Sequence, residues 1–307
     1  MPSRLESLKS YADLRVALML LLGFSCGLPF LLVGGTFTAR LATANIDIKA
    51  IGLFAYLLLP YSFKFLWAPI VDAFDVPLLS RVLGRRRSWM VVAQACAGVA
   101  LLVMSATDPI GSLPLLGLAA FLLAFAAATQ DIVVDAWRIE SADLDRQGAM
   151  LAAYQLGYRF GLISAGAGAL FIAGSAGWQV SYLTMAALMG VGFVASLLAP
   201  APERMRPAGQ VAPAATRERF SFGRAVAAPL TDLYRRQGRR LVAVLALVAF
   251  YRMPDFVSGV MANPFYIRMG FSLQEIAAVS KLYGIWIGIV GAFVGGLSIA
   301  RFASTRR

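Results

Sequence analysis

Long apolar stretches alternate with short polar ones along almost the whole chain. About eight of the apolar stretches are roughly 20 residues long, the length that a helix needs to cross the hydrocarbon core of a bilayer. They are expected near residues 15–38, 50–71, 88–106, 114–136, 148–173, 178–199, 240–262 and 276–300. The pattern therefore predicts an all-α protein, a polytopic bundle of transmembrane helices.

The composition excludes a water-soluble globule. Of the 307 residues, 59% are hydrophobic and 14% are charged, whereas a soluble domain carries about 25% charged residues. Histidine is absent, and Cys26 and Cys96 lie in apolar stretches, so we expect no metal site and no cofactor. The net charge of +12 would fit nucleic acid only on one soluble face. Since the basic residues lie between apolar stretches, membrane lipid is the expected partner and nucleic acid is not.

Lysine and arginine are distributed unequally between the two sets of connections. They are dense at the N-terminus, in the second, fourth and sixth connections and in the tail, and the sixth is very rich in arginine. The opposite connections contain Arg40, Lys49, Arg268 and Lys281. Because cytoplasmic connections carry the excess of basic residues, both termini are predicted to be cytoplasmic.

The chain contains an internal repeat. When the sequence is shifted by about 225 residues, the second copy falls on the first without a gap, and the matched pairs are Arg15 with Arg240, Pro29 with Pro254, Gly34 with Gly259 and Ile51 with Ile276. Two parallel six-helix halves joined by a long cytoplasmic loop form the major facilitator plan. On that plan we expect a six-helix half in residues 1–199, a cytoplasmic linker in 200–239 and two helices of a second half in 240–307. The chain is then expected to be a truncated carrier.

One stretch places charge inside an apolar segment. Asp131, Asp135 and Arg138 are spaced to share one face of a helix. A carboxylate at membrane depth costs a few kcal/mol unless it is paired, hydrated or facing a cavity. We therefore expect this helix to line a polar interior. Lys64, at the predicted inner end of the second span, either faces this polar interior or extends to the cytoplasmic surface.

Two arginines are expected near the middle of the bilayer. Arg159 in the fifth span and Arg252 in the seventh lie at similar counted depths, one in each half. This placement is typical of a central cavity for an anionic solute. The alternative is a pair of buried ion pairs, Arg252 with Asp255 and Arg159 with Asp131 or Asp135.

The connection between the second and third spans has an acid at one end and arginines at the other. Asp72 and the run Arg85, Arg86 and Arg87 can form ion pairs that hold one conformation shut. Arg138 is expected to join this gate. The alternative is that these arginines only set the topology.

Glycine pairs recur at a spacing of four residues. Gly23 and Gly27, Gly157 and Gly161, and Gly284 and Gly288 permit close approach of helix backbones. We expect mainly intramolecular packing from them, and they give no prediction of the oligomeric state.

Several segments together resemble the AmpG-like muropeptide permeases. The segments are GFSCGLPF (23–30), PYSFKFLWAPIVD (60–72), GRRRSW (84–89), ATQDIVVDAWR (128–138), YRMPD (251–255) and MANPF (261–265). The resemblance implies a major facilitator transporter of the bacterial inner membrane that imports anhydromuropeptides with the proton gradient. It also implies a role in peptidoglycan recycling. Related acetyl-coenzyme A transporters share parts of the pattern, so another anionic solute is an alternative substrate.

We assign roles to residues on this basis. The anionic sugar-peptide is expected to bind Arg159, Arg252 and Lys64. Sugar rings are expected to stack on aromatic side chains, namely Tyr61, Trp67, Tyr154 and Tyr158. Asp131, Asp135 and Asp255 are expected to carry the coupling proton, since burial and a like-charged neighbour favour the neutral acid.

Two other classes compete with a transporter. An intramembrane prenyltransferase would bind magnesium diphosphate through aspartate pairs, but Asp143 and Asp145, the candidate second motif, have the wrong spacing. The chain is therefore not expected to be an enzyme. An inactive, truncated carrier is the third possibility.

Overall fold

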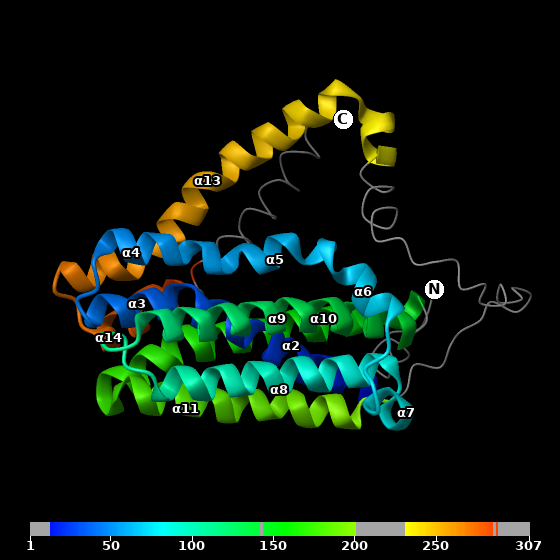
Figure 1. The fold of residues 1–307 in the computed structure, drawn as a ribbon, viewed down its shortest axis with the longest axis horizontal. Coiled ribbons are helices and arrows are strands. Elements are labelled where there is room, and N and C mark those ends of the chain that lie inside the picture. Colours follow the sequence, from blue (N-terminus) through cyan, green and yellow to red (C-terminus); the bar gives the residue numbers. More distant parts are fainter. Residues whose placement is uncertain (1–12, 142–143, 201–230, 285–286, 288–307) are drawn as a thin grey trace, which may run out of the picture.

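The computed structural model describes residues 13–141, 144–200, 231–284 and 287, and these contain helices and no strand. Within this part of the chain, five helical segments are long and apolar enough to cross a membrane. They are Leu14–Thr43, Ile48–Leu66, Arg85–Ala106, Leu113–Ser141 and Arg146–Leu198. The segments run alongside one another as an elongated bundle (Figure 1). The prediction of a polytopic helix bundle is confirmed.

The first segment is a helix with one break. Helix α2 (Leu14–Val33) is followed by α3 (Gly35–Thr43), and Gly34 between them has non-helical angles of φ −92° and ψ −113°. Helix α2 begins at Asp13, whose carboxylate accepts a hydrogen bond from the Arg15 N–H and so caps the helix. The span continues to Thr43, five residues beyond the predicted end at 38.

The second segment is divided into short pieces. Helices α4 (Ile48–Leu53), α5 (Leu59–Phe63) and α6 (Ala68–Ala73) are joined by the 3-10 turns η2 (Phe54–Leu58) and η3 (Lys64–Leu66). Pro60 and Pro69 lie in the first turns of α5 and α6, where a missing N–H is tolerated because the first turn has no acceptor for it. The continuous span predicted over 50–71 is thus a chain of helical turns, and α7 (Leu79–Leu83) follows it.

The next segments are regular and then reverse direction. Helix α8 (Arg85–Ala106) is followed by α9 (Leu113–Ser141), α10 (Leu144–Ile163), the π-turn η4 (Ser164–Gly168) and α11 (Ala169–Leu198). Gly177 inside α11 has φ 88° and ψ 164°. A side chain disfavours such angles, whereas glycine adopts them readily. The chain folds back there, and the Ser181 hydroxyl on one leg donates to the Ala169 carbonyl on the other at 2.7 Å. The predicted spans 148–173 and 178–199 correspond to these two legs.

The last described helices repeat the first ones. Helix α13 (Arg239–Arg268) begins 225 residues after α2, and α14 (Leu273–Glu275) begins 225 residues after α4. The turns that precede α4 and α14 match as well, with positive φ angles at Asn45 and Gly270. Asp47 and Ser272 cap the two helices. The π-turn η5 (Ile276–Tyr283) follows α14. The helix starts therefore have the spacing of the sequence repeat.

Several predicted regions lie outside the described residues. These are 201–230 of the linker and 285–286 and 288–300 of the eighth predicted span. The glycine pair Gly284 and Gly288 is only half described.

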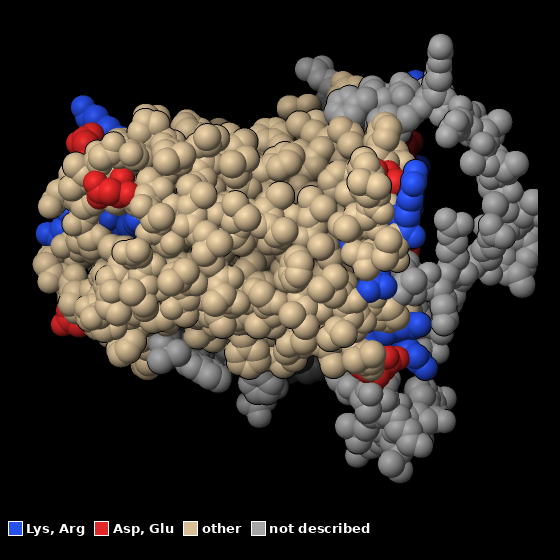
Figure 2. All heavy atoms as spheres, turned by 60° about the horizontal axis from the view of Figure 1, so that its bottom comes forward, with Lys and Arg blue, Asp and Glu red and all other residues tan. Residues whose placement is uncertain are grey.

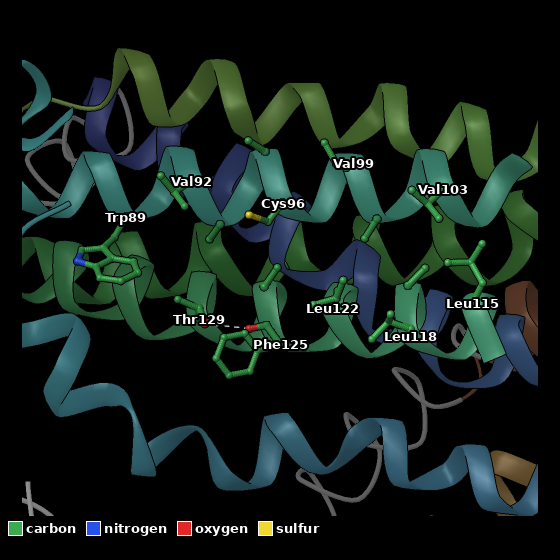
Figure 3. Close-up of a pocket in the computed structure, with 15 residues that line it drawn as sticks. Trp89, Val92, Cys96, Val99, Val103, Leu115, Leu118, Leu122, Phe125 and Thr129 are labelled. Carbon is green, nitrogen blue, oxygen red and sulfur yellow. Dashed lines mark hydrogen bonds between the residues drawn. The ribbon is translucent and has the colours of Figure 1, made fainter. Parts of the chain in front are cut away.

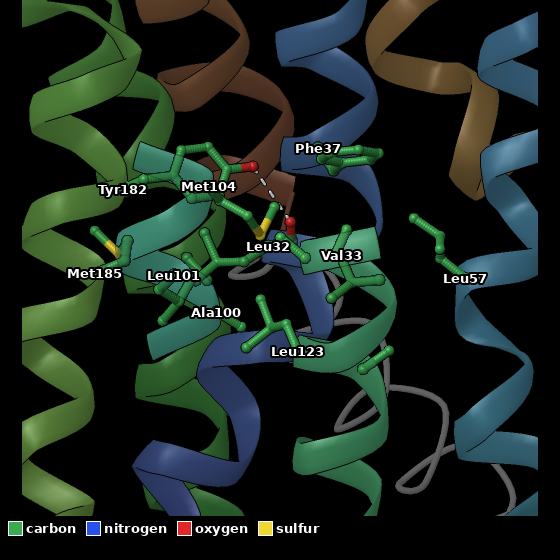
Figure 4. Close-up of a cluster of buried hydrophobic side chains, with 14 of the residues drawn as sticks. Leu32, Val33, Phe37, Leu57, Ala100, Leu101, Met104, Leu123, Tyr182 and Met185 are labelled. Atoms are coloured by element: carbon green, nitrogen blue, oxygen red, sulfur yellow. Dashed lines mark hydrogen bonds between the residues drawn. The ribbon is translucent and has the colours of Figure 1, made fainter. Parts of the chain in front are cut away.

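The hydrophobic core fills the space between α2, α8, α9 and α11. Leu32, Leu101, Leu123 and Met185 are buried there, one from each helix (Figure 4). Tyr182 is also fully buried, and its hydroxyl donates to the Leu32 carbonyl at 3.3 Å. A buried hydroxyl costs little free energy when it is hydrogen-bonded, so this bond lets the large ring join the core.

Helices α2 and α10 are in backbone contact. The contact is made by two glycine pairs, Gly23 with Gly27 and Gly157 with Gly161. A Cβ on Gly157 would lie 1.9 Å from the carbonyl oxygen of Leu20, and one on Gly23 would lie 2.2 Å from that of Tyr154. The prediction of intramolecular packing is confirmed for these two pairs.

Arg40 lies in a helix and not in a connection as predicted. It belongs to α3, and 3% of its surface is exposed. Its guanidinium donates to the carbonyls of Met104 and Thr107 at 2.6 Å each and lies 4.9 Å from the centre of the Tyr182 ring. The last carbonyls of a helix lack partners within the helix, and Arg40 supplies donors to the end of α8.

Charged side chains gather at the two ends of the bundle. In the view of Figure 2 the surface between these ends is uncharged. An uncharged surface of this kind is what a bilayer requires where the protein faces lipid, because exposed charges in hydrocarbon cost free energy. The end that carries Arg86 is called here the Arg86 end, and the opposite end, where Asn263 meets the bundle, is called the Asn263 end.

Candidate functional site

A lysine and an aspartate meet between two segments that are far apart in sequence. Lys64 Nζ, in the broken second segment, lies 3.4 Å from Asp131 Oδ2 in α9. The Asp131 side chain is 12% exposed and the Lys64 side chain 37%. The lysine therefore pairs inside the bundle instead of extending to the surface. The other oxygen, Asp131 Oδ1, is buried and has no hydrogen-bond partner.

Aromatic side chains flank this pair. Trp67 donates its indole N–H to the Thr129 hydroxyl at 3.1 Å and stacks on Phe125, with ring centres 4.7 Å apart. Tyr61, three residues before Lys64, packs edge-on against Phe30 at 5.4 Å. Lys64 begins the 3-10 turn η3 and Trp67 follows it, and side chains three residues apart lie on one side in that geometry.

Tyr154 and Tyr158 border the pair from α10. Their ring centres are 6.1 Å apart, and both are half-buried. The Cys26 thiol lies in contact range of Tyr154 and Asp131. The predicted aromatic residues and the predicted carboxylate Asp131 are thus brought together by α2, α9, α10 and the broken segment.

A polar cluster lies next to Asp131 that the sequence analysis did not identify. Gln130 donates to the Ser25 hydroxyl at 2.8 Å and to the Cys26 thiol at 3.2 Å. Gln94 donates to the same Ser25 hydroxyl at 3.1 Å and to Ser196 at 3.4 Å. Four helices therefore share one buried hydrogen-bond network, and polar side chains between transmembrane helices hold such contacts. The sequence feature that could have indicated this network is the presence of glutamine and serine within apolar spans.

Asp135 and Arg159 are placed differently from Asp131. Asp135 is 49% exposed at its side chain and lies 3.5 Å from Arg138, one helical turn away. Arg159 is exposed and makes no ion pair among the described residues. The alternative pairing of Arg159 with Asp131 or Asp135 is therefore wrong. Gly157 and Gly161, which flank Arg159, contact Leu20 and Phe24, so Arg159 lies about level with the centre of α2.

The side chains of Arg252 and Asp255 lie outside the described residues. Their helix, α13, is described, and both positions are helical. The binding role of Arg252 and the proton role of Asp255 stay predictions.

A second ion-pair network lies at the Arg86 end. Arg86 is buried, and it contacts Asp72 at 2.6 Å and Glu140 at 2.5 Å, the latter also through its Nε. Arg86, at the start of α8, thus ties the end of α6 to the end of α9. The predicted partnership of Asp72 with the arginine run is confirmed for Arg86, and Glu140 is the partner that the sequence analysis missed.

The other predicted gating residues do not join this network. Arg87 donates to the Leu197 carbonyl, and Arg138 contacts Asp135 and Gln147. No ion pair of Arg85 is found in the part of the chain that the structure describes. Their gating role stays a prediction.

Helix α13 contacts α3 and α4 at the Asn263 end. Asn263 is fully buried and donates to the Gly35 carbonyl at 2.6 Å, and Thr38 donates to the Val260 carbonyl at 3.1 Å. Residues 242–251 of α13 are exposed, and Figure 1 shows the helix leaning away from the bundle towards its N-terminus.

This arrangement can bind an anion and exchange a proton. The Lys64 ammonium and the half-buried Trp67 and Tyr61 provide a cation and ring faces, and Asp131 provides a buried carboxyl group beside them. No cluster of potential metal ligands occurs among the described residues.

Comparisons with known proteins identify the family of the chain. Residues 16–307 match the family model of the Major Facilitator Superfamily. Over 303 residues the chain is 36% identical to the anhydromuropeptide permease of Escherichia coli strain K12. The matched region covers 98% of this chain and 58% of the permease. Over 291 residues it is 34% identical to the putative transporter AmpG 4 of Rickettsia felis, covering 94% of this chain and 68% of that protein.

A solved structure has the same fold. The crystal structure of a D-xylose-proton symporter superposes with a TM-score of 0.62 over 95% of this chain and 70% of the symporter. At 13% sequence identity this similarity concerns the fold alone. The chain spans 58% of the length of the E. coli permease.

Proposed function

The chain belongs to the Major Facilitator Superfamily, and from this premise we propose that it imports anhydromuropeptides across the bacterial cytoplasmic membrane, driven by protons. The observation that carries the proposal is the 36% identity to the E. coli anhydromuropeptide permease, which extends over 98% of the chain. The Lys64–Asp131 pair supports it, because an anionic sugar-peptide needs a cation and proton coupling needs a protected acid.

The pair suggests how substrate and proton are linked. While Asp131 is charged, it holds the Lys64 ammonium at 3.4 Å. Protonation of Asp131 removes that attraction and leaves Lys64 to bind a carboxylate of the substrate. Asp135 is a weaker candidate for the proton site than Asp131, because its side chain is 49% exposed and it is paired with Arg138.

The charge distribution supports an orientation with the Arg86 end in the cytoplasm. The connection between the second and third spans is rich in arginine and is predicted to be cytoplasmic. It leads into α8 at the Arg86 end. In that orientation the contact between Asn263 and Gly35 closes the periplasmic side.

Substrate identity is tested by uptake in cells. Bacteria that lack their own permease would express the 307-residue chain and be supplied with a labelled anhydromuropeptide. We expect uptake that an excess of unlabelled anhydromuropeptide abolishes and that acetyl-coenzyme A leaves unchanged. Competition by acetyl-coenzyme A alone would assign another anionic solute. Absence of uptake, with the chain present in the membrane, would contradict transport by this chain.

A further inference from the structure

A long apolar groove runs between α8 and α9, and its lining includes Phe125 and Thr129, which contact Trp67 beside the Lys64–Asp131 pair. It has a volume of about 520 Å³, and its lining is almost wholly apolar. Figure 3 shows Trp89 and Thr129 at one end and Val103 and Leu115 at the other. From Trp89 to Val103, at about 1.5 Å per residue, the groove is about 21 Å long, more than the roughly 15 Å of one leaflet of hydrocarbon.

Small side chains make the groove hollow. Its floor contains buried alanines from both helices, namely Ala93, Ala100, Ala119 and Ala126. Its walls are large exposed side chains such as Val99 and Leu122. The alanines allow the helices to approach closely, and the larger residues on either side leave a channel between them that is open to the surroundings.

The Arg86 end of the groove is marked by a tryptophan and an arginine. Trp89 lines the groove and donates its indole N–H to the Phe74 carbonyl at 2.9 Å. Tryptophan is enriched where the hydrocarbon meets the headgroups. Arg85 lies one helical turn before Trp89, and the spacing of Arg85, Trp89, Cys96 and Val103 places all four on one face of α8.

Arg85 lacks the partners that its neighbours have. Arg86 is bound to Asp72 and Glu140, and Arg87 donates to the Leu197 carbonyl. For Arg85 no ion pair or hydrogen bond of the side chain is found within the described residues, and its buried Nε has no partner. A half-buried guanidinium at headgroup level without a carboxylate is suited to bind a phosphate.

We propose that this groove binds an anionic phospholipid, with one acyl chain between α8 and α9 and the phosphate on Arg85. The apolar lining accounts for the acyl chain and the unpaired cation for the preference for a negatively charged headgroup. A zwitterionic lipid fits the groove equally well but brings its own cation to the phosphate. The site concerns the lipid environment and does not depend on the identity of the transported solute.

Native mass spectrometry of the full chain tests the proposal. The protein is released from nanodiscs of equal phosphatidylglycerol and phosphatidylcholine, and the retained lipids are counted. We expect phosphatidylglycerol to be favoured about fivefold, the factor for about 1 kcal/mol per basic residue near a membrane surface. Arg85→Gln should remove the preference. Arg81→Gln, the same charge loss on the exposed arginine of α7, should keep it.

A second variant tests the groove itself. Val99→Trp fills the channel at a residue that is 59% exposed, so the core does not have to repack. We expect it to lower the retention of both lipids while Arg85 is intact. Equal loss of preference in Arg85→Gln and Arg81→Gln, or unchanged lipid retention in Val99→Trp, would overturn the proposal. A dimer in the wild-type spectrum that Val99→Trp dissociates would assign the groove to a second copy instead.

A native thiol gives an independent readout in the bilayer. Cys96 lines the groove and is exposed, whereas the other cysteine, Cys26, is buried. Alkylation of Cys96 by a membrane-permeant maleimide should be slower in phosphatidylglycerol than in phosphatidylcholine nanodiscs, and Arg85→Gln should equalise the rates. A rate that is the same in both lipids for the wild-type chain would contradict the proposed site.

Discussion

At the scale of single residues, the Lys64–Asp131 pair is asymmetric. Asp131 is buried, with one oxygen unpartnered, while Lys64 is 37% exposed. Removing the lysine leaves a charge in a poorly hydrated place, whereas removing the aspartate leaves a charge that water can reach. The two halves of the pair should therefore differ in their effect on stability.

We expect Lys64→Met to lower the free energy of unfolding by about 3 kcal/mol, the typical cost of leaving a buried charge unpaired. Asp131→Asn should cost about 1 kcal/mol, because it removes the charge together with the need for a partner. Thermal unfolding in detergent measures both. The double variant should recover most of the loss seen in Lys64→Met. Equal losses in the two single variants would contradict the burial of Asp131.

The sequence predicted some members of this site and not others. Asp131 and Lys64 were identified because a charge within an apolar span needs a structural reason. Ser25, Gln94 and Gln130 were missed because uncharged polar residues hardly alter the hydropathy of a span. The partner of Asp131 was not predictable, because Lys64, Arg159 and Arg138 are all close enough in counted depth. Only the rotation of each helix decides between them.

At the scale of elements, the contact of α2 with α10 depends on glycine. We expect Gly157→Ala to destabilise the protein by about 3 kcal/mol or to prevent folding, since its Cβ would lie 1.9 Å from the Leu20 carbonyl oxygen. Gly98→Ala is the matched control, because it lies within helix α8 with no atom within 4 Å of a Cβ. It should be neutral or stabilise the protein by up to about 1 kcal/mol. Comparable losses in the two variants would show that the helices do not touch here.

Element boundaries followed from the sequence where hydropathy decides them. The legs on either side of Gly177 and the start of the repeat at Arg239 fall within a few residues of the predicted positions. The division of the second segment was not predicted, because Pro60 and Pro69, in the first turns of α5 and α6, leave the apolar character of the segment unchanged. The break at Gly34 was also missed, since glycine is compatible with both a helix and a break.

At the scale of the whole molecule, α13 is held to the bundle mainly at one end. The buried bond from Asn263 to the Gly35 carbonyl is central to this contact. In an alternating-access carrier such a contact must break during each cycle. Its strength should therefore set the balance between the closed and the open periplasmic side.

We expect Asn263→Ala to favour separation at this end about tenfold, which corresponds to about 1.4 kcal/mol for one buried hydrogen bond. Spin labels are attached at the exposed positions Lys49 in α4 and Phe265 in α13, in a Cys96→Ala background. Pulsed electron paramagnetic resonance then reports the distance between α4 and α13. Thr184→Ala is the control, because its hydroxyl bonds within α11. An unchanged distance distribution in Asn263→Ala would mean that this bond does not hold the halves together.

The central claim is that Asp131 carries the coupling proton of an anhydromuropeptide importer, and pH-dependent uptake tests it most directly. Labelled anhydromuropeptide uptake would be measured against external pH, with and without a protonophore, in permease-deficient cells expressing the wild-type chain, Asp131→Asn or Asp135→Asn. We predict protonophore-sensitive uptake for the wild type and no pH-dependent uptake for Asp131→Asn at equal membrane levels. Protonophore-sensitive uptake by Asp131→Asn at the wild-type rate would contradict the account.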